Sequence, residues 1–277
     1  MSDPRSAVLG VEHSLTDKRW EASPADDRLA LALRQRHNLS DIVARILVAR
    51  GVDIDLAASF LNPSLKTLLP DPSLLKGMDA AVERIASAIV DGETIGVFGD
   101  YDVDGATSAA LLERFIHTVG GKVDIYVPDR LREGYGPNLP ALLQMKNAGA
   151  SVIITVDCGI TAFDPLAGAA EAGLDVVVVD HHAAEPQLPA ALAVINPNRL
   201  DDESGQGQLA AVGVVFLLVV ALNRCLRGRS HYAASAEPNL LQWLDLVALG
   251  TVCDVVPLTQ IEPRVSSART KGHGTSR

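Results

Sequence analysis

From Thr94 onward, short runs of β-branched and other apolar residues alternate with longer stretches of helical periodicity. Strands are predicted over residues 94–98, 123–127, 151–156, 174–179 and, on a weaker pattern, 191–195. Helices are predicted between them over residues 106–119, 138–148 and 161–172. Nearly continuous apolar strands joined by helical crossovers are typical of a parallel sheet that is buried on both faces. We therefore predict an α/β fold, with a parallel sheet and helices on both faces.

The residues before this pattern are predicted to be helical. Apolar residues recur at helical spacing over residues 26–36 and 39–50, and a further amphipathic helix over residues 78–91 ends at Gly92. The apolar run 209–222 is too short to cross a membrane, which takes about 20 residues, and is predicted to be a buried helix. The predicted organisation is a helical N-terminal region over residues 1–90, an α/β domain over 91–258 and a disordered tail over 259–277.

Acidic and imidazole side chains follow three of the predicted strands. Asp100, Asp102 and Asp104 follow the first strand, and Asp157 follows the third. The fourth strand runs into Asp180, His181 and His182. Ligands of such sheets bind at the carboxyl ends of the strands, so these side chains are expected to meet at one edge.

Carboxylates crowded at one edge repel each other unless a cation compensates their charge. Aspartates with one or two imidazoles suit Mn²⁺ or Mg²⁺, and two such ions can support hydrolysis of a phosphoester or phosphoanhydride. The net charge of −10 argues against a protein that binds nucleic acid over its whole surface, so such contact must be local and metal-assisted. The three cysteines are too few for a disulfide framework, which favours a reducing compartment.

Other interpretations of these residues are weaker. Asp100, Asp102 and Asp104 match the start of an EF-hand loop, but its twelfth position would be Leu111 instead of glutamate. Asp157 taken alone would be expected to cap a helix starting near Thr161. Zinc binding by the cysteines lacks a Cys-x-x-Cys spacing. The histidines outside the 181–182 pair are given no function; they are His13, His37, His117, His231 and His273.

The motifs around Asp100–Asp104, Asp157 and Asp180–His182 resemble the first three motifs of the DHH phosphoesterase superfamily, and residues 249–258 resemble its fourth. Within the superfamily the chain is most similar to the RecJ family, on segments such as 60–65 and 133–138. The resemblance covers residues 18–258.

This resemblance implies a role for each matching residue. It implies two ions, Mn²⁺ or Mg²⁺, with metal ligands Asp102, Asp104, Asp157, His181 and Asp254. Asp157 would bridge the two ions. The implied catalytic residues are His182 at the scissile phosphate, with Asp100 and Asp180 as carboxylates that orient the ligands. The implied substrate-binding residues are Arg130, Tyr135 and Asn138; by charge alone Arg132 is placed as well as Arg130.

The implied function is metal-dependent hydrolysis of phosphodiester bonds in single-stranded DNA, as a cytoplasmic 5′→3′ exonuclease of recombination and repair. The implied partners are single-stranded DNA and a repair helicase or single-strand-binding protein, with no membrane. Two alternatives stay open. One is a DHH-type phosphodiesterase for short oligonucleotides or cyclic dinucleotides, or a pyrophosphatase, and the other is a non-catalytic fragment.

The sequence departs from the RecJ pattern after residue 258. The resemblance implies a DHHA1 domain and an OB-fold after this point, and we expect the chain to lack both; residues 260–277 lack apolar periodicity. Codons for residues 271–276, shifted by one base, can encode Lys-Val-Met-Ala-Arg-Arg, which resembles the RecJ continuation. The tail is therefore expected to be an out-of-frame segment, and the truncated chain could lack activity.

Overall fold

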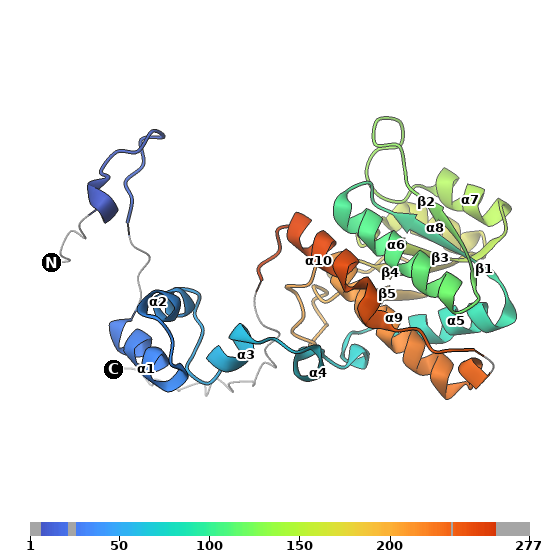
Figure 1. Ribbon diagram of the computed structural model, residues 1–277. Helices are drawn as coiled ribbons and strands as arrows, with labels where there is room; N and C mark the ends of the chain where they lie inside the picture. Colours follow the sequence, from blue (N-terminus) through green and yellow to red (C-terminus); the bar gives the residue numbers. More distant parts are fainter. Residues whose placement is uncertain (1–6, 22–25, 234, 259–277) are drawn as a thin grey trace, which may run out of the picture. The chain divides into compact units, whose positions relative to one another are not determined.

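The computed structural model describes residues 7–21, 26–233 and 235–258, and the chain divides into two compact units, Met1–Leu69 and Pro70–Arg277 (Figure 1). The predicted disordered tail, 259–277, lies outside the described residues.

The first unit is helical, as predicted. Its elements are the 3₁₀ turn η1 (Val8–Gly10) and the helices α1 (Asp27–His37), α2 (Asp41–Ala49), α3 (Ala57–Leu61) and α4 (Leu65–Leu68). Asp26 and Ser40 precede α1 and α2, and their side chains accept hydrogen bonds from the first free backbone N–H groups of those helices. Leu33 of α1 and Leu47 of α2 are buried in a small core of this unit.

The second unit contains a five-stranded sheet in the order β2-β1-β3-β4-β5, with every neighbouring pair parallel. Its strands are β1 (Thr94–Gly99), β2 (Lys122–Tyr126), β3 (Ala150–Val156), β4 (Asp175–Val179) and β5 (Ala193–Ile195). These bounds lie within two residues of the predicted ones, and the weakly patterned fifth strand is present. The predicted parallel α/β fold is confirmed.

Helices cover both faces of the sheet (Figure 1). On one face, α7 (Leu139–Asn147) and α8 (Phe163–Glu171) pack on β3 and β4. On the other face lie α5 (Met78–Asp91), α6 (Val103–Thr118) and α9 (Ala211–Gly228), and α10 (Leu244–Cys253) packs on α6 and α9. The remaining elements are the short 3₁₀ turns η2 (Pro72–Leu74), η3 (His231–Ala233) and η4 (Leu240–Trp243).

The boundary between the compact units differs from the predicted one. The compact units divide after Leu69, whereas the sequence prediction divided the chain after residue 90. Helix α5 lies in the second unit because Met78 and Ile85 are fully buried there, and it packs on α9 and β5.

Helix α9 is the only described helix with the length and hydropathy of a membrane span, and 72% of that span is buried inside the protein, as for a core helix.

Candidate metal centre

Three aspartates lie side by side at the carboxyl edge of the sheet, each directly after its strand. The backbone N–H of Asp100 donates to the carbonyl of Val156, and that of Asp157 to the carbonyl of Val179. The N–H of Asp180 donates in the same way to the carbonyl of Ile195. The sheet ladder therefore fixes the spacing of these three residues.

Five further side chains join this edge. Asp102 is the N-cap of α6 and accepts a hydrogen bond from the Gly105 N–H at 2.9 Å, and Asp104 lies in the first turn. His181 and His182 follow Asp180, and Asp254 follows the end of α10. The residues form three overlapping groups whose ligand atoms lie within 4.8 Å of one another: Asp100, Asp102 and Asp157; Asp104, His181 and Asp254; and Asp157, His181 and His182.

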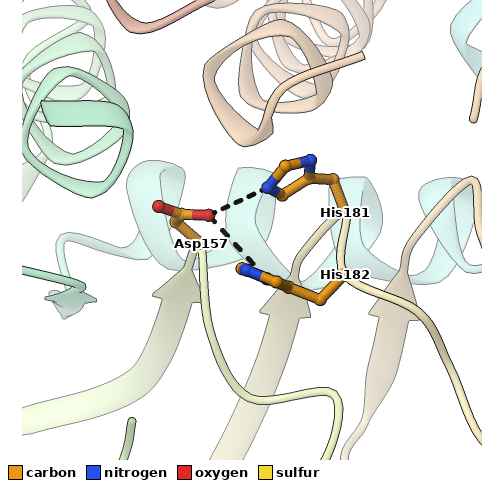
Figure 2. A group of neighbouring side chains, drawn as sticks. All are labelled: Asp157, His181 and His182. Atoms are coloured by element: carbon orange, nitrogen blue, oxygen red, sulfur yellow. Dashed lines mark ion pairs between the residues drawn. The ribbon is translucent and has the colours of Figure 1, made fainter. Parts of the chain in front are cut away.

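Asp157 lies at the centre of these groups. Its Oδ1 atom is 3.3 Å from His181 Nε2 and 4.0 Å from His182 Nδ1. Dashed lines mark both ion pairs in Figure 2. Its backbone has φ 60°, a left-handed conformation that is costly for a non-glycine residue and that clusters at functional sites. The alternative that Asp157 caps the next helix is wrong, because α8 begins at Phe163 with Ala162 as its N-cap.

The two histidine rings are held by hydrogen bonds on Nδ1. His181 Nδ1 lies 3.2 Å from the carbonyl oxygen of Leu209, an acceptor, so Nδ1 carries the proton and Nε2 faces the carboxylates. His182 Nδ1 donates to Asp180 Oδ1 at 2.7 Å. Asp180 also accepts from the backbone N–H groups of Ile160 and His181, so this buried carboxylate orients the ring of His182.

Unpartnered buried atoms gather at this site. Among the described residues, four buried side-chain polar atoms lack a hydrogen-bond partner, and three of them lie here: Asp100 Oδ1, Asp157 Oδ1 and His181 Nε2. Native proteins satisfy nearly all such atoms, and two carboxylate oxygens with an imidazole nitrogen form a suitable donor set for Mn²⁺. The residues present therefore fit divalent metal ions.

The electrostatics of the site favour binding of positive charge. Burial raises the pKa of Asp157 to about 7, and it also raises the pKa values of Asp100 and Asp104. The hydrogen bond to Asp180 raises the pKa of His182 to about 9. Burial opposes ionisation of Asp180 as well, but its hydrogen bonds from His182 and Ile160 lower its pKa overall.

The metal-free protein is expected to be more stable at pH 6 than at pH 8, and Asp157 alone is expected to contribute about 1 kcal/mol of this difference in the free energy of unfolding. Because the pKa of Asp157 is about 7 in the folded state, far above its ordinary value, the folded chain holds a proton that the unfolded chain releases. This contribution is complete at low pH and is lost as the pH rises through 7. Urea unfolding in EDTA measures it, and Asp157→Asn should reduce the difference; an unchanged difference in the variant would contradict the prediction.

The residues predicted to bind substrate have different surroundings. The Arg130 guanidinium lies 5.1 Å from the centre of the Tyr101 ring, and Tyr101 is edge-on to Tyr135. Tyr135 is also edge-on to His182, and its hydroxyl donates to the carbonyl of Asp157 at 3.4 Å. Tyr135 thus borders the metal centre directly, and Arg130 borders it through Tyr101, a residue that the sequence did not single out.

Arg132 and Asn138 make other contacts. Arg132 lies 3.7 Å from Asp129 with 86% of its side chain exposed. Asn138 caps α7 through the Ala141 N–H, and its amide donates to Glu133. The substrate roles of Arg130, Tyr135 and Asn138 stay predictions.

The alternative metal sites are not formed. Cys158 is buried, and burial raises the pKa of its thiol well above the ordinary value, which disfavours the thiolate. No cysteine joins the candidate metal groups among the described residues. The EF-hand alternative fails because residues 103–118 form α6, so a helix occupies most of the segment that would be the twelve-residue calcium loop.

Comparison with known proteins agrees with this geometry. Residues 94–251 match the family described as "DHH family, N-terminal domain". The single-stranded-DNA-specific exonuclease RecJ of Bacillus subtilis is 38% identical over 240 residues, covering 87% of this chain and 29% of the relative. The RecJ of Dickeya dadantii is 43% identical over 224 residues, covering 80% of this chain and 38% of the relative.

Among solved structures, RecJ of Thermus thermophilus in complex with Mn²⁺ matches with a TM-score of 0.67 and 30% identity, covering 87% of this chain and 32% of that chain. The chain thus spans about a third of the length of the relatives that it matches.

Proposed function

Because the chain belongs to the DHH family, we propose that its second unit is a metal-dependent phosphodiesterase that removes nucleotides from the 5′ end of single-stranded DNA. The observation that carries the proposal is the convergence of Asp100, Asp157 and His181 with unpartnered buried atoms at one sheet edge. The names of the similar RecJ proteins support single-stranded DNA as the substrate, and the Mn²⁺-bound structure supports Mn²⁺, with Mg²⁺ as the alternative ion.

The residues of the metal centre have separate roles in this proposal. One ion would be held by Asp102 and Asp157, with Asp100 beside them as the orienting carboxylate, and the other by Asp104, His181 and Asp254. Asp157 lies 3.3 Å from His181 and so would stand next to both ions. When bound, the two ions supply activation of water and neutralisation of charge on the phosphoryl group. Asp180 keeps a proton on His182 Nδ1, so Nε2 of the same ring is available to contact a phosphate oxygen.

The side chains that border the metal centre are of the types that bind a nucleotide. The Arg130 guanidinium provides a positive charge of the right geometry for phosphate, and Tyr101 and Tyr135 provide aromatic surfaces beside His182. Such local contact is compatible with a net charge of −10. We place this reaction in DNA recombination and repair in the cytoplasm, with a repair helicase or single-strand-binding protein as partner.

The test is degradation of single-stranded DNA labelled at either end, with Mn²⁺ and with EDTA. Mononucleotides are expected from the 5′-labelled strand only in Mn²⁺, and duplex DNA is expected to stay intact. Cleavage restricted to dinucleotides would favour the short-oligonucleotide alternative. No cleavage by folded protein that binds Mn²⁺ would contradict the proposed activity for this chain.

A further inference from the structure

Helix α9 begins without a capping side chain of its own. Its N-cap residue is Ala210, which offers no side-chain acceptor. Ala210, Ala211 and Val212 are all fully buried, so water is not available to their backbone N–H groups. The first N–H groups of a helix have no partner within the helix, and burying them unpaired is costly.

Asp104, from α6, supplies the missing acceptors. Its Oδ2 accepts from the Ala211 N–H at 2.6 Å, and its Oδ1 accepts from the Val212 N–H at 2.9 Å. Only 1% of Asp104 is exposed. A carboxylate at this position also interacts favourably with the helix dipole of α9. Asp104 is therefore placed as the N-terminal cap of a helix that starts more than a hundred residues later.

Two further contacts tie this helix start to the metal centre. A Cβ atom at Gly250 of α10 would lie 2.9 Å from Asp104 Oδ1, so the glycine lets α10 close over the carboxylate. The carbonyl of Leu209, just before α9, lies 3.2 Å from His181 Nδ1. The same short segment thus contacts both Asp104 and His181, which belong to one candidate ligand group with Asp254.

We propose that residues 209–212 are a positioning element of the metal centre: Asp104 caps α9, and the start of α9 in return fixes the Asp104 carboxylate and the His181 ring. The effect on metal binding rests on the proposed function, whereas the capping role does not. Asp104 and His181 remain the groups that would touch metal, and residues 209–212 act through them.

The capping role and simple metal ligation predict opposite effects when the Asp104 carboxylate is neutralised in the metal-free protein. A carboxylate that serves only as a ligand is repelled by its neighbours when no ion is bound, so neutralising it should not lower stability. Asp157 is the matched control, because its Oδ1 atom has no hydrogen-bond partner. Neutralising Asp104 should instead lower the stability of the metal-free protein, since both of its oxygens accept hydrogen bonds from backbone N–H groups of α9.

The experiment is thermal unfolding in EDTA at pH 8 of Asp104→Asn and Asp157→Asn, with amide hydrogen exchange at Ala211 and Val212. We expect Asp104→Asn to lower Tm by about 2–8 °C and to speed exchange at both amides, because an asparagine has a single oxygen acceptor. Asp157→Asn should keep or raise Tm. Unchanged Tm and exchange in Asp104→Asn would overturn the proposal.

A second substitution keeps the test decisive if Asp104→Asn folds poorly. Ala210→Ser places a capping hydroxyl at the N-cap of α9, where it can accept from the Val212 or Gly213 N–H. In the Asp104→Asn background we expect Ala210→Ser to recover most of the lost Tm without recovering Mn²⁺ affinity. A double variant as unstable as the single one would overturn the capping role. Failure of the wild-type chain to bind Mn²⁺ would count against the proposed function alone, because the capping readouts are taken in EDTA.

Discussion

Asp157→Asn is expected to lower Mn²⁺-dependent nuclease activity by at least about 10³-fold, the largest loss from any single substitution in the chain. Asp157 belongs to two of the candidate ligand groups. One of them also contains Asp100 and Asp102, and the other contains both histidines. The substitution keeps the size of the side chain and removes the charge, so residue 157 attracts cations far less strongly.

Metal binding gives a readout that does not depend on turnover. Calorimetric titration with Mn²⁺ should show fewer or much weaker sites in Asp157→Asn than in the wild type. Asp124→Asn is the matched control, because Asp124 is an exposed residue of β2 away from the carboxyl edge. Full activity in Asp157→Asn, or an equal loss in Asp124→Asn, would contradict the assignment of the centre.

The strands could be predicted from the sequence because their pattern is local. Runs such as residues 151–156 and 174–179 are almost wholly β-branched or apolar, and strands of this kind need burial on both faces. Once the strands are parallel, the aspartates that follow them must share one edge. The positions of Asp100, Asp157 and Asp180 therefore follow from the sequence with little further information.

Asp254 could not be placed by this reasoning, because it follows a helix. It reaches the site through the close packing of α10 on α6, where a Cβ at Gly250 would lie only 2.4 Å from Thr107 Oγ1. The resemblance to DHH proteins pointed to Asp254, whereas periodicity could not. Long-range packing of this kind leaves no local pattern.

The cap of α9 was missed for a related reason. A helix that starts at Ala211 after Ala210 has no acceptor side chain at the usual positions. That absence is itself a signal, since a buried helix without a local cap needs a distant acceptor. The signal does not say which residue supplies it, and here the acceptor lies in α6. The Tyr101 ring was overlooked because it stands between two aspartates that dominate the motif.

The second large effect is expected for Asp180→Asn, which should lower nuclease activity by about 10²–10³-fold while Mn²⁺ binding stays close to wild type. Asp180 accepts from the His182 ring, from the Ile160 N–H and from the His181 N–H. An asparagine has one oxygen and an amide group in place of the carboxylate, so it cannot hold all these donors. The His182 ring then loses its fixed orientation and the partner of its positive charge.

Titration of His182 separates this orienting role from a merely structural one. In metal-free wild type its pKa is about 9, raised chiefly by the hydrogen bond to Asp180, so the ring stays charged until the pH rises through 9. In Asp180→Asn the pKa should fall toward the ordinary value of about 6.5, which NMR of the ring protons in EDTA can follow. The alkaline limb of the pH–rate profile should move to lower pH with it. Asp180→Glu is the control: it keeps the charge and should retain a raised pKa for His182. If Asp180→Asn and Asp180→Glu gave the same His182 pKa and the same activity, the charge at residue 180 would not act through His182.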